Sequence, residues 1–341
     1  MSISMYKRRN MLAVLEQIHV PGSFLLDTFV NGMETHDTRT IDIDVVRNGK
    51  KMAPFVSPVR EGKVISKEGF KTLTHTIPYI KIKREWNPEQ ALTRRAGLTV
   101  YDGQTPQQFI SSEMGKTLKE FDDMIFRREE WMAAQMIQTG KVVVSGEGQD
   151  WEINTGMATS HLPVLTGVDL WSASTADIQA DLVNWAQKVY ADSGLNATDA
   201  ILGSEASAAM LRNEGFIGAL DRRRIRRGEI DIQKLPKGVK YFGEDLESGL
   251  SLWGYNEGYY DEDTSSTKEL IDPKKVVVIA KGLRFTRHYG MISEVDINFV
   301  GPRFPKTWVT EDPSTRWLML QSSPAVINHQ PDAVVCATVL A

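Results

Sequence analysis

The stretch RFPKTWVTEDPSTRWLMLQSSP, residues 303–324, is the most irregular part of this sequence, and the fold assignment depends on it. It holds three prolines and two tryptophans, and its one strand candidate is WLML at 317–320. Prolines remove backbone hydrogen-bond donors, whereas tryptophans supply large areas for burial. We therefore expect a loop, a short strand and a second loop, with Trp308 and Trp317 as packing anchors beside a long helix. Its basic residues, which could face solvent or a neighbouring copy of the chain, are Arg303, Lys306 and Arg316.

The composition of the whole chain is that of a globular protein of one large domain or two ordinary domains, with 341 residues, 41% hydrophobic and 25% charged. A formal charge of −4 argues against a dedicated nucleic-acid binder. Cys336 is the single cysteine, which excludes an intramolecular disulfide, and its apolar neighbours predict burial. The N-terminus is a poor signal peptide, and no apolar run approaches the roughly 18 residues of a membrane span. We expect a soluble intracellular product with no membrane partner.

Charge is distributed unevenly along the chain. Residues 47–85 carry ten Lys or Arg against three Glu, so the rest of the chain has a net charge of −11. The alternating sequence VISKEGFKTLTHTI, with Gly69 available for a turn, predicts a long hairpin or extended loop. This hairpin has little apolar surface, and isolated two-stranded hairpins are marginal in water. We expect another part of the assembly to hold it.

The strongest helix signal covers residues 105–138, with apolar residues at spacings of three, four or seven. Thr105 is a candidate N-cap, Pro106 suits the first helical position and Gly140 is a stop signal. Its outer face is expected to be mostly acidic, and it is either a solvated face with internal ion pairs or a docking surface for the basic hairpin of a neighbouring copy. Candidate contacts in the second case are Glu120, Asp123 and Glu130 on the helix, with Arg60, Lys63, Lys67 and Lys71 on the hairpin.

Shorter patterns complete an α+β architecture, because helices and strands do not alternate regularly. A short helix is expected over residues 11–18 and another over 176–192, where Ser174 and Asp177 resemble a capping box. Strand candidates include TIDIDVV, a hairpin at 141–153, a strand, turn and helix in AILGSEASAAMLRN, and three C-terminal strands at 276–280, 294–299 and 333–340.

Screens for catalytic motifs find no phosphate-binding loop, dinucleotide fingerprint, zinc-protease motif or nucleophile elbow. The six histidines lack metal-ligand spacing, so we expect no catalytic site, cofactor or metal. A basic cluster, DRRRIRRG, fits three interpretations: phosphate contacts with nucleic acid, pairing between subunits, or a solvated turn. Its arginines are Arg222, Arg223, Arg224, Arg226 and Arg227.

The order of these parts resembles the major capsid proteins of tailed bacteriophages, in particular the lambda major head protein family. The resembling stretches are MAPFVSPVREGKVI, PYIKIKREWNP, TGKVVVSGEG, DRRRIRRG, KGLRFTRHYGMI and the whole of residues 303–324. They follow one another from about residue 50 to the end of the chain. The first 45 residues match only in general character.

The resemblance implies the Hong Kong 97-type capsid fold. On that pattern residues 1–46 are an N-terminal arm and 47–95 an extended loop. Residues 96–164 and 286–341 form a peripheral domain with a spine helix at 105–138, and 165–285 form an axial domain.

The implied function is that of a major capsid protein rather than an enzyme. Its copies would form the hexamers and pentamers of an icosahedral virion shell around double-stranded DNA, assembled in the host cytoplasm and expanding on maturation. Implied partners are a separate scaffolding protein, a portal and a trimeric decoration protein. The alternative function is a nucleic-acid-binding protein that uses the cluster at 222–227.

Overall fold

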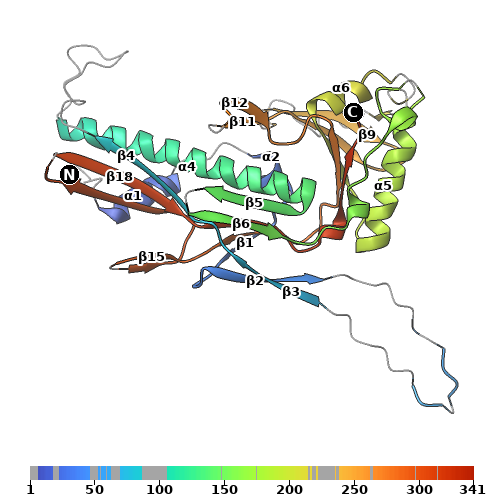
Figure 1. Cartoon of the computed structure of the whole chain (residues 1–341), viewed down its shortest axis with the longest axis horizontal. Coiled ribbons are helices and arrows are strands. Elements are labelled where there is room, and N and C mark those ends of the chain that lie inside the picture. Colours follow the sequence, from blue (N-terminus) through green and yellow to red (C-terminus); the bar gives the residue numbers. More distant parts are fainter. Residues whose placement is uncertain are drawn as a thin grey trace.

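The computed structural model describes most of the chain. The described residues are 7–17, 23–46, 53, 55–58, 60–62, 70–86, 106–146, 148–173, 175–213, 216, 220–221, 235, 238–261, 264–295, 297–312 and 314–341. The molecule is elongated, and helix α4 (Pro106–Thr139) runs along much of its length, with a large sheet and helix α5 (Ile178–Ser193) at one end (Figure 1). No helix in the described ranges combines the length and the apolar character needed to cross a membrane. The mixture of helices and sheets confirms the predicted α+β class.

The long helix confirms the prediction made from its apolar spacing. It has Pro106 as its first residue, whereas the candidate cap Thr105 lies outside the described residues. At its other end Gly140 has a φ of 67° and donates its N–H to Met136 O at 3.0 Å. A Cβ at this glycine would lie 2.5 Å from Met157 Cβ. Only glycine satisfies both the left-handed backbone and this close approach, so the helix ends here.

Helix α4 contributes to two separate cores. Its first half packs in a small cluster with Met11 of helix α1 (Arg8–Gln17) and with the C-terminal hairpin; the α4 side chains there are Met114, Leu118, Phe121 and Ile125. Its second half joins the main core, through Met132, Ala133, Ala134, Met136 and Ile137. The helix therefore connects two regions that would otherwise share little apolar surface.

The main core is built on a six-stranded sheet in the order β20-β13-β7-β10-β9-β8. Its central strands are apolar on both faces, as expected of strands covered on both sides. Helix α5 packs against β13 and β20, and Asp177 caps it by accepting from Ala180 N at 3.0 Å. The capping box predicted from Ser174 is thus replaced by Asp177 as the N-cap, and Ser174 lies outside the described residues. The bounds are β7 Asp199–Leu202, α6 Ser204–Met210, β8 Leu220–Asp221, β9 Val239–Asp245, β10 Ser251–Tyr255, β13 Lys275–Ile279 and β20 Val334–Thr338.

The stretch at 303–324 is a regular hairpin, so the prediction of two loops around one short strand was wrong. Strand β17 (Phe304–Thr310) pairs with β18 (Thr315–Ser322), which also pairs with β4 (Ile80–Trp86). Strand β17 is the edge strand of this sheet, the position in which a sheet tolerates a proline such as Pro305. Leu318 and Leu320 face α4, whereas Trp308 and Trp317 stack on each other, with ring centroids 6.1 Å apart, at alternate positions on the opposite face. The leucines, not the tryptophans, anchor the hairpin to the helix.

The first strand of the predicted basic hairpin lies earlier in the sequence than expected. Strand β3 (Phe70–Thr76) pairs antiparallel with β2 (Thr40–Val46), which the sequence had placed in the N-terminal arm. Ile41 and Ile43 of β2 are buried in the main core, so the base of the hairpin is fixed by this chain itself. Both strands then leave the body of the molecule side by side (Figure 1). Gly69, the predicted turn, lies outside the described residues.

Smaller elements fill the remaining edges. A three-stranded sheet in the order β1-β14-β19 packs against α4 through β19. The alternation at 294–299 is two short paired strands rather than one, because the chain turns at Val295, which is fully exposed. The bounds are α2 Phe24–Thr28, β1 Gly32–Thr35, β5 Lys141–Gly146, β6 Gln149–Asn154, β11 Gly258–Asp261, β12 Ser266–Glu269, β14 Phe285–Tyr289, β15 Ile292–Glu294, β16 Ile297–Phe299 and β19 Pro324–Asn328, with 3-10 turns at Thr159–His161, Gly167–Asp169 and Pro331–Ala333.

Candidate interaction surfaces and the charged centre of helix α4

A buried ion cluster joins the C-terminal hairpin to α4. Arg303 Nε lies 2.5 Å from Asp122 Oδ1, and Arg303 Nη1 lies 2.7 Å from Glu129 Oε1. Tyr289 OH donates to the other oxygen of Glu129 at 3.1 Å. Burial disfavours the guanidinium charge, but the Glu129 carboxylate, Tyr289 and Asp122 outweigh it and raise the pKa of Arg303. Two carboxylates thus share one guanidinium, and each charged group has an oppositely charged partner inside the chain, which favours its burial.

A second buried carboxylate on α4 holds the N-terminal segment. Glu130 accepts hydrogen bonds from the backbone N–H groups of Leu25 and Leu26 at 2.9 and 3.1 Å, and from Tyr255 OH at 2.9 Å. Leu25 and Leu26 lie in the first turn of α2, whose N–H groups have no partner within the helix. Burial raises the pKa of Glu130, and the hydrogen bonds it accepts oppose that rise. Glu130 thus supplies, from 105 residues away, the cap that the local sequence does not provide.

The far end of α4 is joined to the large sheet by one amide. Gln138 Nε2 donates to Leu270 O at 2.9 Å, and Gln138 Oε1 accepts from Asp272 N at 2.9 Å. Residues 270–272 lead directly into β13 of the six-stranded sheet. The helix is therefore tied by polar contacts to the hairpin, to the N-terminal segment and to the sheet.

The predicted acidic face of α4 is divided by burial. Glu130 is 3% exposed, so placing it on an outer face was wrong, and the neighbouring Glu129 is 0% exposed. Asp123 is half-buried, and burial is the main cause of the raised pKa of its carboxyl. Of the three predicted contact residues Glu120 alone is exposed, and its carboxylate lies 2.6 Å from Arg84 Nη1. Arg84 belongs to β4, so the last part of the basic segment contacts α4 within the same chain.

The predicted basic contacts are only partly described. Arg60 is exposed, and Lys71 lies on β3 opposite Val45. The positions Lys63 and Lys67 and the arginine cluster, Arg222, Arg223, Arg224, Arg226 and Arg227, lie outside the described residues. Exposed apolar side chains occur at Phe55 and Val56 of the loop beyond β2 and β3. The intersubunit roles of these charges therefore stay a prediction.

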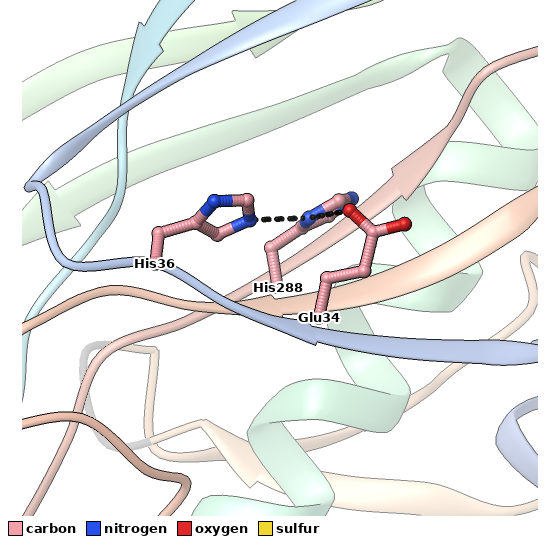
Figure 2. A group of neighbouring side chains, drawn as sticks. All are labelled: Glu34, His36 and His288. Carbon is pink, nitrogen blue, oxygen red and sulfur yellow. Dashed lines mark hydrogen bonds and ion pairs between the residues drawn. The ribbon is translucent and has the colours of Figure 1, made fainter.

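One group of side chains was not predicted from the sequence. Glu34, His36 and His288 come together between β1 and β14, and within the described part of the chain they are the only such group whose geometry suits a metal ion (Figure 2). The histidines are 252 residues apart, so no linear motif could show it. The detectable signal was the spacing of two residues between Glu34 and His36, which in extended chain directs both side chains to the same face. Cys336, by contrast, is buried as predicted, and burial raises the pKa of its thiol to about 12.

Comparison with known sequences gives a match over almost the whole chain. The model of the family described as phage major capsid protein E matches residues 7–339. The major capsid protein of Escherichia phage lambda is 26% identical over 345 residues, which covers 98% of each chain. The major capsid protein of Enterobacteria phage P21 is 25% identical over 350 residues, covering 99% of this chain and all of the relative.

Solved structures give the same fold. A putative capsid protein of a prophage from E. coli CFT073 superposes with a TM-score of 0.69 at 18% identity, covering 99% of this chain and 100% of the other. A phage-related protein from Bordetella bronchiseptica RB50 gives 0.54 at 12% identity, covering 98% and 97%. The Hong Kong 97-type fold expected from the resemblance is confirmed. Because the family match spans the described chain from end to end, this chain belongs to the phage major capsid protein E family.

Proposed function

We propose that this chain, a major capsid protein of a tailed phage, forms the hexamers and pentamers of an icosahedral shell around double-stranded DNA. Self-assembly into a virion shell follows from the family, and the arrangement of subunits is the proposed part. The residue ranges expected for arm, loop, peripheral domain and axial domain are proposed with it. Assembly takes place in the host cytoplasm, with a scaffolding protein, a portal and a trimeric decoration protein as partners.

The observation that carries this proposal is the hairpin of β2 and β3. Its base is fixed in the core by Ile41 and Ile43, while the strands extend away from the body of the molecule (Figure 1). Beyond them Phe55 and Val56 expose apolar surface, and Arg60 exposes charge. A segment that buries no apolar face of its own gains stability only by lying on another chain. A neighbouring copy supplies that surface in every position of a closed shell.

We also propose how the subunits move when the shell expands during maturation. Expansion of such a shell requires rigid-body rotation of subunits and renewed docking of their loops, and it requires no catalytic chemistry. The polar ties of α4 to both ends of the molecule support movement of each subunit as one body. The alternative use of residues 222–227 in nucleic-acid binding is not favoured by the family match.

Electron microscopy tests the proposal directly. The chain is expressed with its cognate scaffolding protein, and the particles are examined before and after exposure to the conditions that release the scaffold. Closed shells built of hexamers and pentamers support the proposal. A monodisperse monomer under all assembly conditions would contradict it.

Charge reversal on the loop tests the role of the hairpin. Lys63, Lys67 and Lys71 are changed together to Glu, and we expect loss of assembly with a folded monomer, because like charges oppose docking on acidic surface. The matched control changes the same three residues to Arg, which keeps the charge and should assemble. Sedimentation velocity measures assembly and circular dichroism measures folding. Normal shells from the Glu variant would refute charge-guided docking.

A further inference from the structure

The cluster between β1 and β14 is built by strand pairing. The two strands are parallel, with Glu34 directly opposite His288. His36 follows two residues after Glu34, and its backbone N–H donates to Tyr289 O at 2.8 Å, which continues the pairing past the end of β1. Side chains two residues apart on one strand and directly opposite on its neighbour share a face of the sheet. The backbone alone therefore directs all three side chains to one place (Figure 2).

The ligand atoms already lie near the spacing that an ion requires. His36 Nε2 is 2.9 Å from His288 Nδ1, and His288 Nδ1 is 3.7 Å from Glu34 Oε2. All three atoms lie within 4.8 Å of one another. Tetrahedral Zn²⁺ with bonds of about 2.0–2.1 Å separates its ligand atoms by about 3.3 Å. The separations of His288 Nδ1 from His36 Nε2, 2.9 Å, and from Glu34 Oε2, 3.7 Å, lie on either side of this ligand spacing. Side-chain shifts of a few tenths of an ångström therefore bring these atoms to it.

A threonine fixes the orientation of the buried histidine. Thr286 Oγ1 lies 2.6 Å from His288 Nε2 and 2.7 Å from His329 Nε2. If His288 Nε2–H donates to Thr286 and the hydroxyl donates onward to His329, the lone pair of His288 Nδ1 points at Glu34 and His36. Metal-ligating histidines are commonly held by such a bond through their second nitrogen.

The other side of the cluster is open. His288 is buried, His36 is half-buried and Glu34 is exposed, so an ion can enter from solvent and keep a water as its fourth ligand. Arg284 is the competing cation, with Nη2 3.5 Å from Glu34 Oε1. It contacts the oxygen that faces away from the histidines, and its side chain is 60% exposed, so the pairing is weak.

We propose that Glu34, His36 and His288 form a binding site for Zn²⁺ or another late first-row divalent ion. Two imidazole nitrogens and one carboxylate oxygen are the donor set of such ions, whereas Mg²⁺ and Ca²⁺ prefer oxygen ligands. On binding, His36 carries its proton on Nδ1 instead of Nε2, by exchange with solvent. The ion joins the N-terminal segment to β14, and it stabilises the folded chain because the unfolded chain does not bring these residues together.

Cobalt spectroscopy on the untagged full-length chain tests the site. The protein is freed of metal with a chelator and titrated with Co²⁺, whose visible absorption reports four-coordinate nitrogen and oxygen ligands, and Zn²⁺ then displaces it. We expect one ion per chain and a Zn²⁺-dependent rise in the unfolding temperature. His36→Asn and Glu34→Gln, both at accessible positions, should each weaken Zn²⁺ binding at least about tenfold.

The matched control is His75→Asn, because His75 is half-buried on β3 and lies outside the cluster. Circular dichroism verifies that each variant is folded. Unchanged binding in His75→Asn together with loss in both cluster variants supports the site. Equal Co²⁺ spectra in wild type and His36→Asn, or no spectrum beyond that of the free ion, would overturn the proposal.

Discussion

Two arginines reach helix α4 from separate segments of the chain, and they meet different environments. Arg303, at the start of the C-terminal hairpin, pairs with Asp122 and Glu129, and the three side chains are 12%, 7% and 0% exposed. Arg84 on β4 pairs with Glu120, and these side chains are 46% and 56% exposed. The distances are similar, at 2.5 to 2.7 Å. Distance alone therefore does not separate a structural ion pair from a surface one.

The two pairs differ in what happens to the carboxylate when its arginine is removed. An exposed carboxylate that loses its arginine returns to water at little cost. A buried carboxylate has no water to return to, so its partner cannot be removed without a large penalty. The acidic residues of α4 accordingly divide into a surface set, available to other chains, and an interior set that holds this chain together.

The largest effect is expected from removal of the buried arginine. Arg303→Met leaves Asp122 and Glu129 buried without their cation, which should lower the free energy of unfolding by about 3–5 kcal/mol. Arg84→Met is the matched control and should cost less than about 1 kcal/mol. Urea unfolding followed by circular dichroism measures both. Adding Glu129→Gln to Arg303→Met should recover part of the lost stability. Equal losses for Arg303→Met and Arg84→Met would show that burial does not separate the two ion pairs.

A smaller effect is expected from the pH dependence of Glu130, a buried carboxylate with no arginine among its partners in the described part of the chain. Burial raises its pKa in the folded state above the unfolded value of about 4.5, so the folded chain binds the proton more readily. Its contribution to stability therefore increases as pH falls from neutrality toward that unfolded value, by at most about 1.4 kcal/mol per pH unit.

Glu130→Gln should abolish this dependence. Between about pH 7.5 and about pH 5, the unfolding free energy of the wild type should rise relative to that of the variant. Urea titrations at both pH values measure it. A shift in favour of the variant would show that the hydrogen bonds of Glu130 dominate over its burial.

The smallest effect is expected at the exposed pair. A double-mutant cycle on Arg84→Met and Glu120→Gln should give a coupling energy of about 0.2–1 kcal/mol, and about 1 M NaCl should reduce it, because solvent-exposed charges are screened. The cycle on Arg303 and Glu129 should keep its coupling in the same salt. Coupling that survives salt at both sites would mean that Arg84 is less solvated than its exposure indicates.

Local patterns were enough to predict the elements that depend on local physics. The span of α4 follows from apolar spacing, Pro106 and Gly140, and α5 follows from its own apolar face and Gly194. The same patterns failed where pairing decides the structure. Strand β17 looks irregular in sequence because Pro305 interrupts it, yet an edge strand tolerates a proline. The alternation at 294–299 suits a strand, but no covering layer buries Val295, and the chain turns instead.

The site residues show the same limit. Which carboxylates of α4 are interior depends on Arg303 and on α2, both far away in sequence, so charge spacing could not separate Glu130 from Glu120. The histidine cluster depends on the parallel pairing of β1 with β14, a contact with no local signature. The family resemblance supplied the architecture that these distant contacts create, because it draws on the whole order of segments rather than on any one of them.

The cap that Glu130 places on α2 has a consequence for the order in which the chain can fold. The α2 segment leaves the ribosome 105 residues before Glu130, so at about 5–20 residues per second it waits some 5–20 seconds for its cap. A helix of five residues is not stable by itself during that time. Its apolar side chains, including Phe24 and Leu25, are then accessible to any other protein that binds them. A segment that is synthesised early is thus capped only after α4 has followed it out of the ribosome.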